Sequence, residues 1–129
     1  MKNLFVFFTA GCIGALANSL VVWFFGDAGV TEMAGVAIAP SLTLAWLYPR
    51  IVWGGIWGLL FILPIFKSRI FLKGSLLSLL PTLVQLLFIF PEAGKDMGGL
   101  ALGTLTPVFV LFYNWIWGIV AAAAIKAAR

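Results

Sequence analysis

Four long apolar runs, separated by short stretches that hold most of the charges, dominate the chain. They cover residues 4–25, 50–66, 74–90 and 107–125. A run of about 20 apolar residues is long enough to cross the hydrocarbon core of a bilayer as a helix. The pattern therefore predicts an all-α integral membrane protein with four transmembrane helices. Pro81 is expected to bend the third helix, because proline cannot donate a helical hydrogen bond.

Two further apolar segments, residues 28–48 and 91–106, are left between the predicted spans. The second is short, and both are interrupted by glycine, proline or acidic residues. Non-helical backbone at membrane depth must be buried in protein, because lipid offers no hydrogen-bond partner. We expect both segments on the same, outer side of the membrane, as interfacial or re-entrant elements.

The distribution of charge supports four spans and orients them. With four spans, six basic and no acidic residues fall on one side, against two basic and four acidic residues on the other. Basic residues are enriched in cytoplasmic loops, so both termini and the loop at residues 67–73 are predicted to be cytoplasmic. A six-span arrangement would place that loop outside. We expect a multi-pass protein of a bacterial-type inner (cytoplasmic) membrane.

The start of the chain also has features of a secretory signal peptide. A basic residue, an apolar run and the small-residue sequence at residues 15–17 fit such a peptide. The apolar run continues to Phe25, however, and is then long enough to span a bilayer. We interpret residues 4–25 as a retained first transmembrane helix.

The two segments between the spans resemble each other at a spacing of 64 residues. Residues 32–54 align with residues 96–118 without a gap, and six of the 23 pairs are identical. We infer an internal duplication with halves at residues 1–64 and 65–129, each made of helix, outer segment and helix, in parallel orientation. Such repeats build a site at their interface in other membrane proteins. The alternative is that duplication only produced a stable bundle.

Each predicted helix carries small or weakly polar residues at helical spacing. Helices in lipid associate through such residues, because their backbones approach closely and their side chains hydrogen-bond. The candidate helix-packing or polar-lining residues are Gly11, Gly14, Asn18, Gly54, Gly58, Ser78, Thr82, Gln85 and Gly118. They predict either tight packing of all four helices or a polar pathway between them.

A second set of residues marks the predicted outer mouth or the repeat interface. The set is Glu32, Gly35, Arg50, Asp96, Gly99 and Asn114. Arg50 begins the predicted second helix, and Glu32 is available to pair with it; the alternative is that each is hydrated at the interface. No charge is expected at the centre of a span, where insertion would cost roughly 2.5–3.5 kcal/mol.

The composition narrows the chemistry. The chain is 64% hydrophobic and only 9% charged, which fits a protein whose solvent is the lipid bilayer. It contains no histidine and one cysteine, so the commonest general base and the usual zinc ligands are missing. We expect no catalytic residue, no bound metal and no cofactor. The net charge of +4 is not gathered into a patch suited to nucleic acid.

Part of the chain resembles a group of bacterial inner-membrane proteins. The resemblance rests on RIVWGGIWGLLF (residues 50–61), KGSLLSLLPTLVQLLFIFP (residues 73–91) and NWIWGIVAAA (residues 114–123). These resemble the YagU-like four-helix proteins over residues 50–129, through Trp53-Gly54, Trp117-Gly118, Gly74 and Pro91. Arg50 and Asn114 stand where those proteins have histidine. The resemblance implies a four-helix inner-membrane protein and no established activity.

These observations leave three functional hypotheses. The first is an accessory or scaffold subunit that associates with other membrane-protein subunits or with itself. The second is a channel or facilitator for a small solute, with its pathway near the repeat interface or between protomers. The third is a membrane enzyme, which no reactive set of residues supports.

Overall fold

The computed structural model describes residues 2–66 and 68–129, which form helices and loops without any strand. The elements are α1 (Lys2–Asp27), α2 (Val30–Met33), α3 (Leu44–Gly58), η1 (Leu59–Ile62), α4 (Ile70–Leu77), α5 (Leu79–Val84), η2 (Gln85–Ile89), α6 (Phe90–Glu92), η3 (Met97–Leu102) and α7 (Thr106–Ala127). Together they give four helical stretches long and apolar enough to cross a membrane, namely Lys2–Asp27, Leu44–Ile62, Ile70–Glu92 and Thr106–Ala127. The four predicted helices are therefore confirmed.

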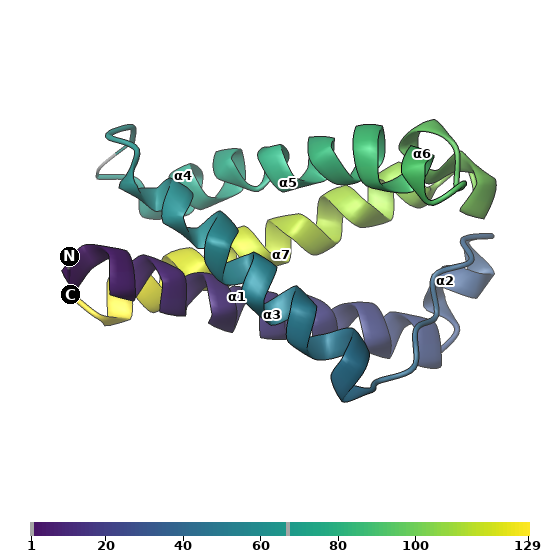
Figure 1. Ribbon diagram of the computed structural model, residues 1–129, viewed down its shortest axis with the longest axis horizontal. Coiled ribbons are helices and arrows are strands. Elements are labelled where there is room, and N and C mark those ends of the chain that lie inside the picture. The colour runs from purple at the N-terminus through teal and green to yellow at the C-terminus, as the bar shows by residue number, and fades with distance from the viewer. Residues whose placement is uncertain (1, 67) are drawn as a thin grey trace.

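The four long helices run back and forth between two ends of the molecule. Figure 1 shows both chain ends and the loop between η1 and α4 at one end, with α2 and α6 at the other. Large apolar side chains stay exposed on every long helix, as Phe5, Val52, Leu83 and Val108 illustrate. Such exposure is expected where lipid, rather than water, surrounds a protein. The chain is a multi-pass membrane protein.

Two helices begin earlier than their hydrophobic runs predict. The helix predicted from residue 50 begins at Leu44, after Thr43, whose hydroxyl accepts a hydrogen bond from the Trp46 N–H at 3.2 Å. The third stretch begins at Ile70, four residues before the apolar run at residues 74–90 and at the earlier start that the sequence also allows. As a consequence, Arg50 lies inside α3 and Lys73 inside α4.

Lys73 was predicted in the loop at residues 67–73 but belongs to α4. Its side chain is 6% exposed, and its Nζ donates hydrogen bonds to the carbonyls of Phe61 (2.7 Å) and Leu63 (2.6 Å). The Phe61 carbonyl stands where η1 ends and helical partners run out, and the Leu63 carbonyl beyond it also accepts from the Ile65 N–H at 2.9 Å. The buried ammonium thereby fixes the end of the second stretch against the start of the third.

Close glycine contacts join α1 to α3. A Cβ on Gly54 would collide with Ala15, and one on Gly11 would collide with the Gly54 carbonyl. A Cβ on Gly58 would lie 2.9 Å from the Gly11 Cα. Only glycine allows backbones to approach in this way, which is the role predicted for these residues.

A similar crossing joins α4 to α7. A Cβ on Gly118 would collide with the Gly74 carbonyl and would lie 3.2 Å from the Ser78 Cβ. Between the two pairs, α1 also packs on α7, where the Trp117 indole N–H donates to the Gly11 carbonyl at 3.1 Å. The interior therefore forms around α1 and α7, with α3 and α4 on their outer sides.

The third stretch is interrupted one turn before Pro81. Helix α4 ends at Leu77 and α5 begins at Leu79, with Ser78 between them. Pro81 has no N–H to donate to the Leu77 carbonyl, which accounts for a break at this position. Beyond it the helix widens into the π-helical turn η2, which begins at Gln85.

The two outer segments contact each other. The Ala37 N–H donates to the Leu102 carbonyl at 2.9 Å, and a Cβ on Gly103 would collide with the Gly35 carbonyl. The segment after α2 is extended and returns along the end of α1, where Ala39 packs on Gly26. Each backbone segment thus supplies the other with a hydrogen-bond partner.

Candidate functional site

Helices α3 and α5 pack against different partners, α1 and α7, and enclose a groove between them. Figure 1 shows α3 crossing in front of the bundle and diverging from α5 and α6 toward the end that carries α2. Two cavities occupy this α3–α5 groove. The first, of about 410 Å³, reaches the outer segments, and the second, of about 500 Å³, lies between α3 and the α5–η2 stretch.

The two cavities meet at a set of polar side chains, here called the polar centre. Asn18, Arg50, Gln85 and Asn114 line both cavities. They come from α1, α3, η2 and α7 respectively, so each of the four spans contributes one residue. All four were predicted as candidate residues: Asn18 and Gln85 as helix-packing or polar-lining residues, and Arg50 and Asn114 as residues of the outer mouth or repeat interface. The structure brings these residues together.

Arg50 is the only charged residue of this centre and is held in place by α1. Its Nε donates to the Ser19 hydroxyl at 2.9 Å, and its Nη2 donates to the side-chain Oδ1 of Asn18 at 2.6 Å. The guanidinium also lies over the Trp46 ring, 4.7 Å from the centroid. A guanidinium has five N–H donors, so these contacts leave part of its hydrogen-bonding capacity unused within the described chain.

The two amides beside Arg50 are held by α7 and α5. Asn18 donates through Nδ2 to the Tyr113 carbonyl at 2.5 Å, and Asn114 donates to the Thr82 hydroxyl at 3.0 Å. Because each amide is tied to a neighbouring helix, the orientation of the polar centre depends on all four spans. Gln85, in contrast, makes no side-chain hydrogen bond among the described residues.

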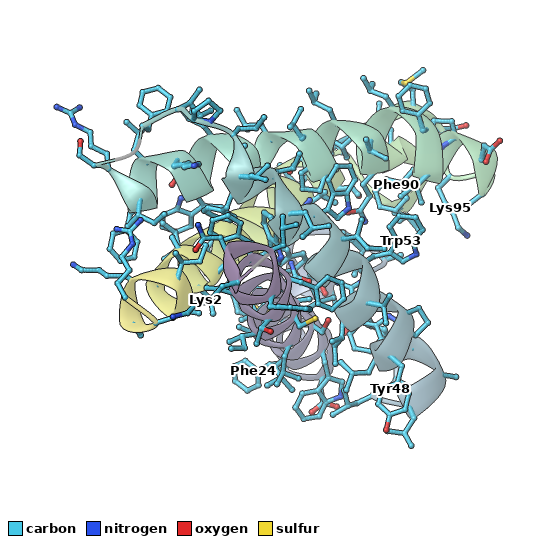
Figure 2. All side chains as sticks on the ribbon, turned by 60° about the vertical axis from the view of Figure 1, so that its left-hand side comes forward. Lys2, Phe24, Tyr48, Trp53, Phe90 and Lys95 are labelled. Atoms are coloured by element: carbon cyan, nitrogen blue, oxygen red, sulfur yellow. The ribbon has the colours of Figure 1, made fainter. Side chains whose placement is uncertain are left out.

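The charges around the groove are of one sign. Lys95, in the loop before η3, lines the first cavity together with Arg50. The four acidic residues are exposed and line neither cavity; they are Asp27, Glu32, Glu92 and Asp96. In Figure 2, Lys95, Phe90 and Trp53 lie over one part of the molecule, and Tyr48 and Phe24 lie away from them. The groove therefore favours negative charge.

The predicted pair of Glu32 and Arg50 is not formed. Glu32 is exposed on α2, and Arg50 bonds instead to the polar groups of α1. The earlier start of α3 explains the difference, because it places Arg50 within the bundle rather than at its mouth. The predicted outer-mouth residues separate accordingly, since Arg50 and Asn114 line the cavities and Glu32, Gly35, Asp96 and Gly99 do not.

The residues predicted for helix packing serve the scaffold of the site. Gly14 approaches the Trp117 carbonyl, where an added Cβ would lie at 2.6 Å, and so holds α1 against α7. Ser78 and Thr82 are buried, and their hydroxyls donate to the carbonyls of Ser75 (2.6 Å) and Ser78 (2.8 Å). These bonds lie beside the break before Pro81 and use carbonyls that the bent helix leaves accessible.

Sequence reasoning missed Lys95, Trp46 and Tyr113 as residues of the site. Lys95 contributes only to the charge distribution that orients the spans. The sequence around Trp46 and Tyr113 carries no motif that would mark either residue as part of a site. Tyr113 lines the first cavity, and its hydroxyl is buried without a hydrogen-bond partner among the described residues. An unpaired buried hydroxyl is uncommon and costs free energy.

The described residues contain no group of three His, Cys, Asp or Glu side chains placed to hold a metal ion. What the site offers is one guanidinium, three amides and a nearby lysine around a divided cavity. Comparison of the chain with protein-family models, curated proteins and solved structures finds no match.

Proposed function

We propose that this protein is a facilitator that binds a small solute in the α3–α5 groove and lets it cross or enter the membrane. The single observation that carries the proposal is Arg50, a charge placed between helices where two cavities meet. A charge inside a span is costly, and such residues usually face a cavity and mark a pathway. Packing alone gives no reason for an arginine at this position.

The proposed architecture is two similar halves, residues 1–64 and 65–129, in parallel orientation about an axis along the membrane normal. Equivalent contacts support it. Gly54 packs on Gly11 as Gly118 packs on Gly74, each pair joining the two spans of one half. The bond from Arg50 to the Asn18 side chain likewise has its counterpart, 64 residues further on, between Asn114 and Thr82. The polar centre then lies at the repeat interface, as in other membrane proteins built from repeats.

The proposed location is a bacterial-type inner membrane, with both termini in the cytoplasm. The support is the excess of basic residues at one end, including Lys2, Arg69 and Lys126. In this orientation the first cavity opens toward the outer side, and the second lies deeper in the bilayer.

Flux measurements test the proposal. The protein is reconstituted in liposomes, and their volume change is followed in gradients of urea, glycerol, acetate, phosphate and medium-chain carboxylates. We expect at least one solute to move faster than through empty liposomes. Gln85→Trp should slow it by filling the groove, whereas Leu83→Trp, on the exposed face of the same helix, should not. Permeability equal to that of empty liposomes for every solute would contradict the proposal.

An accessory or scaffold role is the second candidate, favoured by the one-sided packing of α3. Its buried residues are Gly54, Gly55 and Gly58, which face α1, while Val52 and Ile56 are exposed on the other side. A helix from another subunit or a second copy would cover that face. Native mass spectrometry of the gently extracted protein tests this role, which a monomer without any partner would contradict.

A further inference from the structure

Arg50 presents hydrogen-bond donors suited to a planar anion. Two of its five N–H groups are used by Ser19 and Asn18, which fix the guanidinium without neutralising it, because both acceptors are uncharged. A guanidinium with remaining donors binds a carboxylate or phosphate through two parallel hydrogen bonds. No acidic side chain lines the groove to compete for this role.

The first cavity leads an anion toward Arg50. Lys95 stands at the end formed by the outer segments, and Arg50 at the end shared with the second cavity. Two cations with no opposing carboxylate lower the energy of a negative charge along the whole cavity. Tyr113 also lines this cavity, and its buried hydroxyl has no hydrogen-bond partner among the described residues.

The second cavity has the opposite character. Apart from the polar centre it is lined by apolar side chains, including Trp53, Trp57, Val84 and Ile89. Of these, Trp53 and Ile89 are exposed on the lipid-facing side, at 59% and 54%. An alkyl chain in this cavity would touch aromatic and aliphatic surface on both sides and would lie beside the lipid. A small hydrated ion would gain nothing from such walls.

We propose that the solute is a single-chain anionic amphiphile. Its carboxylate or phosphate head binds Arg50, and its alkyl chain lies between α3 and α5. The inference rests on the groove being the solute site proposed above, and names its class. A volume of about 500 Å³ lies within the range of sites for one small ligand, which favours one alkyl chain over the two chains of a phospholipid.

Quenching of tryptophan fluorescence by a brominated ligand tests the proposal, because Trp53 and Trp57 line the second cavity. Bromododecanoate is titrated into the protein in neutral maltoside micelles, and bromododecanol serves as the uncharged ligand of equal chain length. We expect saturable quenching by the carboxylate. Arg50→Met should weaken binding by about tenfold or more, the loss expected for a charge-assisted pair. Arg69→Met, an exposed cation at the other end, should change nothing.

Other results would overturn the proposal. Equal affinity for bromododecanol would show that the groove recognises the alkyl chain and not the negative charge. Equal weakening of binding by Arg50→Met and Arg69→Met would show unspecific attraction between the anion and a basic protein. If Arg50→Met does not fold, it is replaced by Lys95→Gln, which lies in an exposed loop. We expect Lys95→Gln to weaken binding of the carboxylate, and unchanged binding would contradict the proposal. Competition with phosphatidylglycerol and with inorganic phosphate shows which kind of anion the groove prefers. If either displaces bromododecanoate at a lower concentration than dodecanoate does, the assignment to a single-chain amphiphile is overturned.

The flux experiment and the quenching experiment test different proposals, and each can fail without the other. Saturable quenching without transport of any solute would remove the facilitator role and leave an anion-binding groove. Transport of glycerol or urea without quenching would keep the facilitator and remove the amphiphile.

Discussion

At the scale of single residues, the site is defined by which polar atoms have partners. Asn18, Arg50 and Asn114 are tied to neighbouring helices by hydrogen bonds. The Tyr113 hydroxyl has none among the described residues, although its side chain is only 4% exposed. Such an atom either completes its bonding with a bound molecule or remains a cost to the folded state.

We expect Tyr113→Phe to stabilise the ligand-free protein. Removing a buried, unpaired hydroxyl relieves a desolvation cost of about 1–3 kcal/mol, so the free energy of unfolding should rise by about 1 kcal/mol. Tyr48→Phe, at an exposed position, is the control and should have no effect. The measurement is thermal or urea unfolding in micelles. A loss of stability on removing the Tyr113 hydroxyl would show that this group has a partner.

At the scale of helices, stability depends on glycine crossings more than on large apolar side chains. Gly54 against Ala15, and Gly118 against Gly74, leave no space for a methyl group. Moving an apolar side chain from lipid into the protein interior supplies no hydrophobic driving force for helix association. Close backbone contact and hydrogen bonds are what remains to hold the helices together.

Gly54→Ala is therefore expected to separate α3 from α1. The added Cβ would collide with the Cβ of Ala15, and overpacking of this kind costs about 1–3 kcal/mol. Ile56→Ala, on the exposed face of the same helix, should change the free energy of unfolding by much less. Helical circular dichroism during thermal unfolding measures both. Equal effects at the two positions would argue against the crossing.

The helices were predictable from the sequence because lipid imposes a length and an apolar composition on any span. The boundaries were not, because they depend on local capping. Thr43 starts α3 six residues before the predicted position, and Pro49 lies within the helix rather than before it. Because α3 begins earlier than predicted, Arg50 lies in the polar centre rather than at the predicted outer mouth.

Much of the site was within reach of sequence reasoning. Asn18 and Gln85 stand out as polar residues within apolar runs, and Arg50 and Asn114 as equivalent positions of the two predicted halves. Lys95 was not, because nothing in its local sequence indicates which cavity its loop will border. The cavities themselves follow from how far α3 and α5 diverge, which only packing determines.

At the scale of the whole molecule, most basic residues lie at one end and the four acidic residues lie at the other, together with Lys95. The chain ends and the η1–α4 loop share one end, as four spans require (Figure 1). The proposed orientation places that end in the cytoplasm.

Labelling of single cysteines measures this orientation. In a Cys12→Ala background, Glu32→Cys and Glu92→Cys should react with a membrane-impermeant maleimide in intact cells. Ser68→Cys and Lys126→Cys should react only after permeabilisation. All four positions are exposed, so accessibility within the protein is matched. The reverse pattern would invert the orientation, and labelling of all four from one side would contradict four spans.

The contact between α1 and α7 has a consequence for biogenesis. The first and last of the four spans meet through the bond from Trp117 to the Gly11 carbonyl and the bond from Asn18 to the Tyr113 carbonyl. Before α7 is made, α3 can already bring Arg50 to Asn18 and Ser19, but the Asn18 Nδ2 and the Gly11 carbonyl still lack the partners that α7 supplies. The contacts that close the bundle, from α7 back to α1, therefore become available only after the fourth span has been made.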